Sequence, residues 1–306
     1  MSNTAISIME VGARDGLQNE KQILSVETKT EFIHRLSQSG LKRIEAGSFV
    51  SPRWVPQMAN SLEVMQGMVR QTEVEYSALI PNLEGLEMAI KANSDRVSLF
   101  TAASEAFCQK NINCSTAESI ERFKPVVKDA RARNIPVRGY VSCVGGCPYQ
   151  GKVPHGDIVD MSERLYDIGC DEISLGDTIG AGTPNQMKSI FREVARSIPL
   201  SSLGMHFHDT FGQALANTYA CLELGVRNID SAVAGLGGCP YAEGASGNLA
   251  TEELVYMLQG MGIDTGINLE ALVSTGNWVC QQLNICNRSK ASLALSEKLY
   301  HAWESL

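Results

Sequence analysis

Two histidines separated by one residue, His206 and His208, are the clearest chemical signal in this sequence. They lie in the run Leu-Gly-Met-His-Phe-His-Asp-Thr-Phe-Gly, which we interpret as a strand and the turn after it. Side chains alternate between the two faces of a strand, so both imidazoles project the same way and Phe207 points into the opposite layer. Paired imidazoles on one face are the beginning of a divalent-metal site. The simpler alternative is a strand with two histidines and no ligand.

Polar residues near the ends of other predicted strands favour the metal site. Asp15 follows the first strand, Glu45 interrupts the second, and Asn248 ends a glycine-rich loop after the last. Asp15 supplies charge, the histidines supply neutral nitrogens, and Asn248 can add a carbonyl oxygen. The absence of thiolate ligands favours Mg²⁺ or Mn²⁺ over structural zinc, although imidazole also suits Zn²⁺ and Co²⁺. Such an ion can chelate a carbonyl and a neighbouring hydroxyl, and Arg14 can hold negative charge on an enolate oxygen.

Each of these residues also has a structural explanation when taken alone. Asp15 can brace a turn, and Glu45 can pair with Arg43 or Arg14. Asn248 can cap the helix that follows it, a role that asparagine commonly takes. These polar residues all lie near the ends of predicted strands. A shared site explains them together better than a separate structural role for each.

The elements that would position these side chains recur as a short strand followed by a helix. Helical periodicity marks Thr28–Ser39 and Met187–Ser197, and glycines such as Gly40 and Gly169 follow predicted helix ends. The strands are expected at Ile6–Val11, Arg43–Phe49, Glu75–Ile80, Arg96–Thr101, Val137–Cys143, Glu172–Asp177, Leu203–Asp209 and Asn228–Ala234.

Eight strand–helix modules in about 260 residues predict an α/β fold, a (β/α)₈ TIM barrel with additional C-terminal helices. A doubly wound open sheet is the alternative, but it would require a glycine-rich phosphate loop after its first strand. We expect one catalytic domain, 1–306, with the barrel over about 1–263 and a helical extension over about 268–306. Reactive groups of such barrels lie at the C-terminal ends of the strands, where the polar residues above fall.

Composition limits the classes of partner. The formal charge is −8, from 26 basic and 34 acidic residues, which argues against a nucleic-acid partner. No apolar run approaches the ~20 residues of a membrane span. Nine scattered cysteines indicate free thiols in a reducing compartment. Because the first strand begins near the start of the sequence and the last three residues are no peroxisomal signal, we expect a complete cytoplasmic protein.

The motifs resemble those of 3-hydroxy-3-methylglutaryl-CoA lyases, which are metal-dependent barrel enzymes. These enzymes share an Arg-Asp-Gly motif at the end of the first strand. The resemblance covers nearly the whole chain. In this family a proline is common where Ala13 stands, and a cysteine is often found at Phe207; neither position has an implied role. The most specific segments are 12–19, 48–56, 138–143, 206–217 and the signature loop 235–252, whose cysteine separates these lyases from their relatives.

The resemblance implies that the acyl-CoA substrate is cleaved to acetyl-CoA and acetoacetate, as in leucine breakdown, by a homodimer. It implies a catalytic arginine, Arg14, and an acid/base cysteine on a mobile loop, Cys239. The implied metal ligands are Asp15, His206, His208 and Asn248. The implied supporting carboxylates are Glu45, Asp177 and Glu252. The positions that line the acyl pocket in this family are Gln18, Tyr140, Ser174 and Thr178.

The expected mechanism is a retro-Claisen cleavage. A base, either Asp177 or His206, removes the proton of the C3 hydroxyl, and the C2–C3 bond breaks. The enolate of acetyl-CoA then forms near Arg14 and is protonated by Cys239. Three alternatives stay open: a lyase for a different 3-hydroxyacyl-CoA, a synthase that condenses acetyl-CoA with a 2-oxo acid, and a non-catalytic metal-binding barrel.

Overall fold

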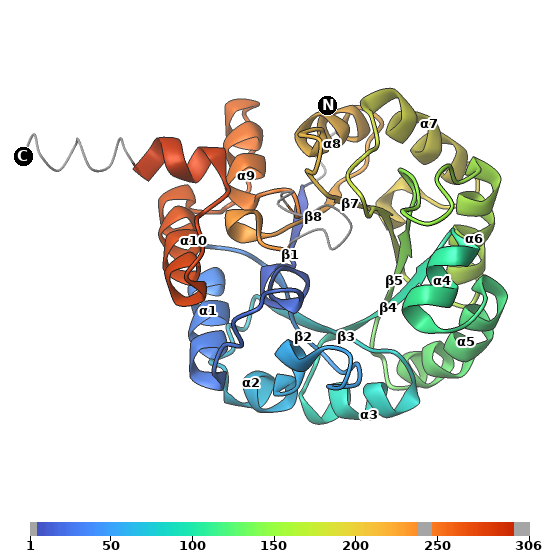
Figure 1. Ribbon diagram of the computed structural model, residues 1–306, viewed down its shortest axis with the longest axis horizontal. Helices are drawn as coiled ribbons and strands as arrows, with labels where there is room; N and C mark the ends of the chain where they lie inside the picture. The colour runs from blue at the N-terminus through green and yellow to red at the C-terminus, as the bar shows by residue number, and fades with distance from the viewer. Residues whose placement is uncertain (1–4, 238–246, 297–306) are drawn as a thin grey trace, which may run out of the picture.

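The eight strands of the computed structural model, which describes residues 5–237 and 247–296, close into a parallel barrel (Figure 1). Each strand pairs with the next along the chain, and β8 returns to β1. This confirms the predicted α/β barrel. The strands are β1 (Ser7–Glu10), β2 (Arg43–Ser48), β3 (Glu75–Leu79), β4 (Arg96–Ala102), β5 (Val137–Ser142), β6 (Glu172–Asp177), β7 (Leu203–Phe207) and β8 (Asn228–Ser231).

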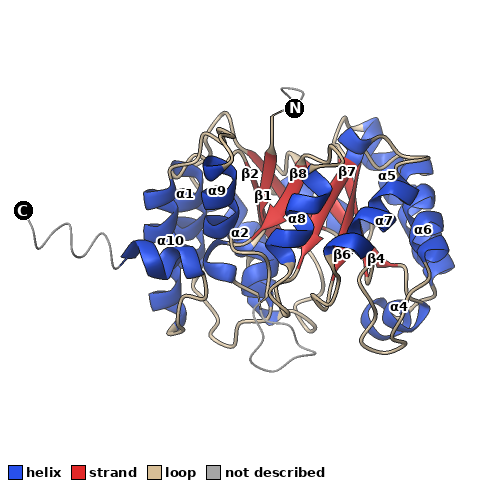
Figure 2. Ribbon diagram, turned by 90° about the horizontal axis from the view of Figure 1, so that it is seen from above, coloured by secondary structure: helices blue, strands red, loops and turns tan. Residues whose placement is uncertain are grey.

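Helices surround the strands on the outside (Figure 2). Gly40 and Gly169 follow α1 and α6 with φ of +97° and +107°, the left-handed conformation expected of a glycine that ends a helix. The helices are α1 (Val26–Gln38), α2 (Ser61–Gly67), α3 (Leu83–Lys91), α4 (Glu105–Ile112), α5 (Thr116–Ala132), α6 (His155–Asp167), α7 (Pro184–Val194), α8 (Ala214–Leu222), α9 (Thr251–Gly260) and α10 (Leu269–Leu283).

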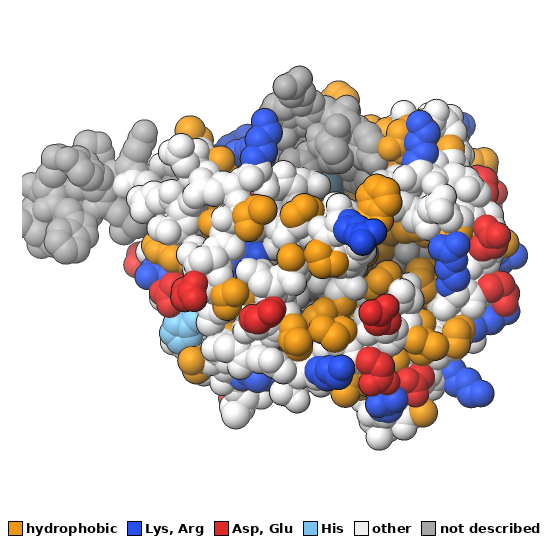
Figure 3. Space-filling model, turned by 60° about the horizontal axis from the view of Figure 1, so that its bottom comes forward, with side chains coloured by type: hydrophobic (Ala, Val, Ile, Leu, Met, Phe, Trp, Pro, Cys, Tyr) orange, Lys and Arg blue, Asp and Glu red, His pale blue; other side chains and the backbone are white. Residues whose placement is uncertain are grey.

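The additional C-terminal helices pack beside the barrel. Helix α10 contacts α1 and α9 (Figure 1), and a further helical segment begins at residue 290. None of the helices in the described ranges has both the length and the hydropathy needed to cross a membrane. On the face drawn in Figure 3, acidic and basic side chains are interspersed rather than gathered by sign. The described cysteines form no disulfide, and all of them except Cys286 are buried.

Strand β8 ends earlier than the sequence predicts. Residues Val233–Gly235 form a 3₁₀ turn, η4, in which Ala234 has a φ of +60°. The strand cannot continue through a residue in the left-handed region, so the prediction that it extends to Ala234 is wrong. The backbone amides of Val233 and Ala234 donate instead to two buried carboxylates, Glu10 and Glu252.

The two faces of the strands have opposite character. Side chains that point outward, such as Ile173, Leu175 and Phe207, join the apolar core beneath the helices. Side chains that point inward include a group of charged residues at the N-terminal end of the barrel. There Arg43 pairs with Glu75 at 3.0 Å and with Glu172 at 2.9 Å. The polar groups at the other end of the interior form the candidate site.

Candidate active site and metal centre

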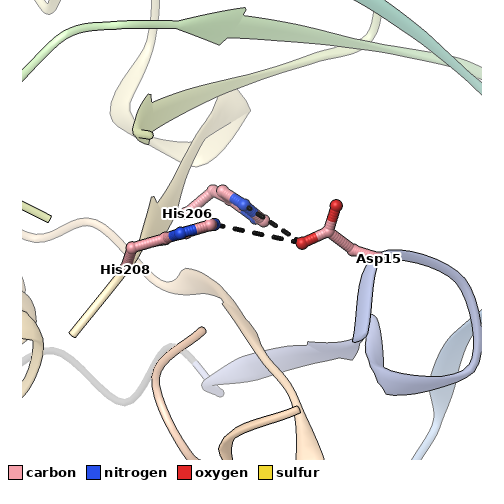
Figure 4. Close-up of side chains that lie close together, drawn as sticks. All are labelled: Asp15, His206 and His208. Atoms are coloured by element: carbon pink, nitrogen blue, oxygen red, sulfur yellow. Dashed lines mark ion pairs between the residues drawn. The ribbon is translucent and has the colours of Figure 1, made fainter. Parts of the chain in front are cut away.

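Three predicted metal ligands converge at the C-terminal end of the barrel. Asp15 lies in η1 (Gly12–Gly16), a turn of π-helix after β1, whereas His206 lies in β7 and His208 directly follows it. Figure 4 shows both imidazoles directed toward the Asp15 carboxylate. Its Oδ2 is 3.9 Å from His206 Nε2 and 4.0 Å from His208 Nε2. One ligand atom from each residue lies within 4.8 Å of the others, close enough to share one ion.

The protonation of these groups fits a divalent cation. Burial, and then the neighbouring His206, lower the pKa of His208 to about 4, so its imidazole is neutral at neutral pH. Burial alone would raise the pKa of Asp15, but Arg14 and the two histidines together hold it well below its ordinary value. The ionised Asp15 carboxylate and the neutral His208 imidazole are therefore in the protonation states that a metal requires of its ligands.

Asn248 also reaches the site, but with its amide nitrogen. The Nδ2 group donates to Asp15 Oδ2 at 2.8 Å and to the carbonyl of Leu236 at 3.0 Å. A metal is bound by the carbonyl oxygen of an amide, so a ligand role for Asn248 requires the amide to be rotated. The backbone leaves little room here, because a Cβ on Gly237 would lie 2.7 Å from this nitrogen.

Arg14 is held in a fixed position between two carboxylates. Its Nε donates to Glu45 Oε2 at 2.5 Å, and its Nη1 donates to Asp15 Oδ1 at 2.7 Å. Burial disfavours the charged guanidinium, but Glu45 and then Asp15 outweigh it and raise the pKa of Arg14. The arginine is thus a permanent, oriented positive charge beside the predicted metal ligands, and Glu45 holds it through this ion pair.

Three of the predicted acyl-pocket residues make hydrogen bonds to the protein. Tyr140 accepts from Arg138 Nη1 at 3.0 Å and approaches Glu45 at 3.4 Å; burial raises the pKa of its phenol well above the ordinary value. Ser174 donates to Asp230 at 3.2 Å, and Thr178 accepts from the Cys143 amide at 2.9 Å. The fourth is Gln18, whose buried Oε1 has no partner among the described residues. Their contact with substrate stays a prediction.

Asp177 lies at the end of β6, on the same side of the strand as Ile173 and Leu175. Its Oδ2 accepts from the Gly182 amide at 2.8 Å, and its buried Oδ1 has no partner in the described part of the chain. Burial raises the pKa of this carboxyl to about 6. A Cβ on Gly145 would lie 2.0 Å from Oδ1, so only glycine fits beside it.

Glu252 supports the loop after β8 rather than the metal ligands. Its carboxylate accepts from the Ala234 amide and from Ser292 Oγ, each at 2.9 Å, and burial raises its pKa to about 8. Glu10 holds the same turn through the Val233 amide, and burial raises its pKa to about 7. The turn leads into the loop that carries Cys239, which lies outside the described residues.

Sequence reasoning missed two buried carboxylates, Glu10 and Asp230. Glu10 accepts from the Gly12 amide at 2.8 Å and so joins the start of η1 to the turn after β8. Asp230 accepts from His206 and Arg138 inside the barrel. Both are acidic residues within predicted strands of the barrel, where a buried carboxylate is uncommon, and this is the signal that could have found them.

An α/β barrel with paired charges and converging histidines at the C-terminal ends of its strands defines a barrel enzyme. The family model described as HMGL-like matches residues 5–279, and the chain belongs to this family. The resemblance inferred from the motifs is thereby confirmed, and the chain is a carbon–carbon lyase of the hydroxymethylglutaryl-CoA lyase group.

Named relatives and solved structures agree with this assignment. A mitochondrial hydroxymethylglutaryl-CoA lyase of Macaca fascicularis is 55% identical over 94% of this chain and 89% of its own length. A cytoplasmic 3-hydroxy-3-methylglutaryl-CoA lyase of Homo sapiens is 54% identical over 94% of this chain and 78% of its own. The crystal structure of hydroxymethylglutaryl-CoA lyase from Pseudomonas aeruginosa superposes with a TM-score of 0.94 at 51% identity, covering 96% of this chain and 98% of that one.

A further solved structure of an HMG-CoA lyase contains bound ligands. An HMG-CoA lyase from Acinetobacter baumannii, in complex with coenzyme A and 3-methylmalate, superposes with a TM-score of 0.90. It is 37% identical, covering 95% of each chain. An acyl-CoA substrate class therefore follows for this family.

Proposed function

We propose that this enzyme cleaves (S)-3-hydroxy-3-methylglutaryl-CoA to acetyl-CoA and acetoacetate, assisted by one divalent cation. The observation that carries the proposal is the convergence of Asp15, His206 and His208 beside Arg14. It occurs in a chain more than half identical to hydroxymethylglutaryl-CoA lyases over 94% of its length. The carboxylate ligand, and the absence of a thiolate from the cluster among the described residues, favour Mg²⁺ or Mn²⁺ over structural zinc.

The metal would be held by Asp15, His206 and His208, with Asn248 as a fourth ligand after rotation of its amide. When bound, such an ion supplies a Lewis acid that lowers the pKa of a coordinated hydroxyl. Arg14 is positioned to stabilise negative charge that develops on the thioester oxygen as the enolate forms. Glu45 and Asp15 hold the guanidinium on both sides, so it does not need to reorganise during the reaction.

The proposed reaction breaks one carbon–carbon bond of the substrate and forms one carbonyl group. A base takes the proton of the C3 hydroxyl, the C3–O bond becomes the ketone of acetoacetate, and the C2–C3 bond breaks. Its electron pair stays on C2 and the thioester oxygen as the enolate of acetyl-CoA. Cys239 then donates a proton to C2, and the proton held by the base returns to the thiolate through solvent.

Asp177 and His206 are both candidate bases. Asp177 has a pKa near 6 and one carboxylate oxygen that makes no hydrogen bond to a described residue, but it lies on the outward side of β6 with Ile173 and Leu175. The Nδ1 atom of His206 is already bonded to Asp230, and its Nε2 atom is directed at the metal position.

We also infer a homodimer of single-domain chains, each with a barrel over about 1–263 and an extension over about 268–306, acting in leucine degradation. We propose the cytoplasm as its location. Named relatives include cytoplasmic and mitochondrial forms.

A coupled assay for acetoacetate tests the proposal. Protein stripped with EDTA is incubated with 3-hydroxy-3-methylglutaryl-CoA, before and after addition of Mg²⁺ or Mn²⁺. Acetoacetate that appears only with metal supports both substrate and ion. If neither ion yields acetoacetate, the substrate is reassigned by testing less branched 3-hydroxyacyl-CoAs and then the condensing direction.

A further inference from the structure

A buried aspartate lies behind one of the metal-ligand histidines. Asp230 is in β8, and its inward-pointing side chain is fully buried. The Oδ1 atom accepts from Arg138 Nη2 at 2.6 Å. The Oδ2 atom lies 3.1 Å from His206 Nδ1 and accepts from Ser174 Oγ at 3.2 Å. Three side chains from three different strands therefore meet at one carboxylate.

We propose that Asp230 is a positioning residue that fixes the tautomer and orientation of His206 for metal binding. A carboxylate paired with a buried arginine is a hydrogen-bond acceptor only, so the proton of the neutral imidazole must be on Nδ1. The lone pair is then on Nε2, the nitrogen directed at Asp15. The inference rests on the proposed metal site at Asp15, His206 and His208.

The second histidine lacks this support. The Nδ1 atom of His208 is buried and has no hydrogen-bond partner in the part of the chain that the structure describes. The two imidazole rings are close neighbours, with a centroid distance of 5.4 Å and an angle of 52° between their planes. They differ in the hydrogen bonding of their Nδ1 atoms. A carboxylate behind a ligand histidine fixes its ring and makes it a better donor to the metal. His206 is therefore the stronger and better oriented ligand of the pair.

The same aspartate connects the metal ligands to the catalytic arginine. Arg138, which binds Asp230, also donates to the Tyr140 hydroxyl at 3.0 Å. That hydroxyl approaches Glu45 at 3.4 Å, and Glu45 accepts from Arg14 at 2.5 Å. Since Arg14 also donates to Asp15, this chain of contacts leads from His206 to Asp15, whose Oδ2 is 3.9 Å from His206 Nε2.

The test is the substitution Asp230→Asn, which keeps the size of the side chain and removes its charge. Its amide can donate to His206 Nδ1, which would place the imidazole proton on Nε2 and block the metal lone pair. We expect the dissociation constant of Mn²⁺ alone, measured by electron paramagnetic resonance, to increase about 10–100-fold. The matched control is Glu172→Gln, which removes a carboxylate from the same interior that pairs with Arg138 but contacts neither histidine. It should change Mn²⁺ affinity by less than about threefold.

A second measurement needs no variant and no metal. In the metal-free wild-type protein, ¹⁵N–¹H correlations of the His206 ring at pH 8 should show a proton on Nδ1 and none on Nε2. A proton on Nε2 would overturn the inference, and so would equal loss of Mn²⁺ affinity in the two variants. Absence of Mn²⁺ binding by the wild type would instead remove the proposed metal site, while the tautomer measurement still decides the role of Asp230.

Discussion

The two ends of the barrel interior are built from the same residue types but differ in charge balance. At the N-terminal end, Arg43 and Arg96 lie among Glu75 and Glu172, and each charge has an opposite charge within 3.0 Å. At the C-terminal end, two arginines lie among three carboxylates: Arg14 and Arg138 with Asp15, Glu45 and Asp230. Arg138 joins the two sets, because it pairs with Glu172 at 2.9 Å and with Asp230 at 2.6 Å. Whichever set Arg138 is counted in, the C-terminal set carries an excess negative charge.

The excess charge coincides with an excess of lone pairs. Asp15 Oδ2 and the two histidine Nε2 atoms are directed at one point, and Asp15 Oδ2 accepts a hydrogen bond there from the Asn248 amide. A paired interior network stabilises a fold only weakly, because desolvation offsets the attraction. An interior that is short of one cation is instead a binding site for one. Charge balance therefore distinguishes the structural end of this barrel from the functional end.

The largest expected effect is that of Asp15→Asn at the C-terminal end. It removes the negative charge that makes the site attractive to a cation while keeping the size of the side chain. Metal assistance contributes several kcal/mol to such reactions, so kcat should decrease roughly 10³-fold. The measurement is acetoacetate release at saturating Mg²⁺. Turnover within tenfold of the wild type would show that the excess charge is not the origin of the activity.

The corresponding change at the N-terminal end is Arg43→Met. It leaves Glu75 and Glu172 with one arginine partner each and should lower the free energy of unfolding by about 3 kcal/mol. Urea denaturation measures this loss. In the folded variant kcat should stay within about twofold of the wild type, because no metal ligand contacts this network. A large decrease in kcat without loss of stability would contradict the division between the two ends.

His208, at the C-terminal end of the barrel, should make the stability of the protein depend on pH. Its folded pKa of about 4 lies below the unfolded value of 6.5, so the unfolded chain binds a proton first as the pH falls. Stability is fully present above pH 6.5 and decreases toward pH 4, by about 2 kcal/mol at pH 5. Asp177 acts in the opposite sense, since its raised pKa favours folding at low pH. Comparison of metal-free wild type with His208→Gln isolates the histidine, and parallel pH profiles would refute its role.

The smallest expected effect is that of Ser174→Ala. The hydroxyl donates one of three hydrogen bonds to the Asp230 carboxylate, and Arg138 and His206 remain after its loss. A single hydrogen bond of about 1 kcal/mol corresponds to roughly a fivefold decrease in kcat/KM. If Ser174 instead lines the acyl pocket, KM for the acyl-CoA will increase and Mn²⁺ affinity will not change. Steady-state kinetics together with Mn²⁺ titration separate the two roles.

Much of the fold could be predicted because the repeated modules carry local signals. Strand β6 was expected at Glu172–Asp177 and is observed there, and Gly40 and Gly169 end helices as predicted. Strand β8 was expected to continue to Ala234. It stops at Ser231 because carboxylates from β1 and α9 bind the amides of the turn, a tertiary interaction that no local pattern reveals.

The site could be predicted in part for a similar reason. Alternation along β7 and the residue that follows it places His206 and His208 on one face, and the barrel brings Asp15 to them across strand β8. The pairing of Asp230 with His206 could not be predicted in this way, because it depends on the register between strands β7 and β8, which no local pattern reveals. The direction of the Asn248 amide depends on its two acceptors, Asp15 and Leu236, and is likewise not contained in the sequence pattern.

The most direct test of the contrast between the two ends is the number of Mn²⁺ ions bound per metal-free chain. We predict one ion for the wild type, one for Arg43→Met, and none at the same concentration for Asp15→Asn. Electron paramagnetic resonance counts the free ion and gives the bound number by difference. Retained binding in Asp15→Asn, or its loss in Arg43→Met, would contradict the assignment of the cation site to the C-terminal end of the barrel.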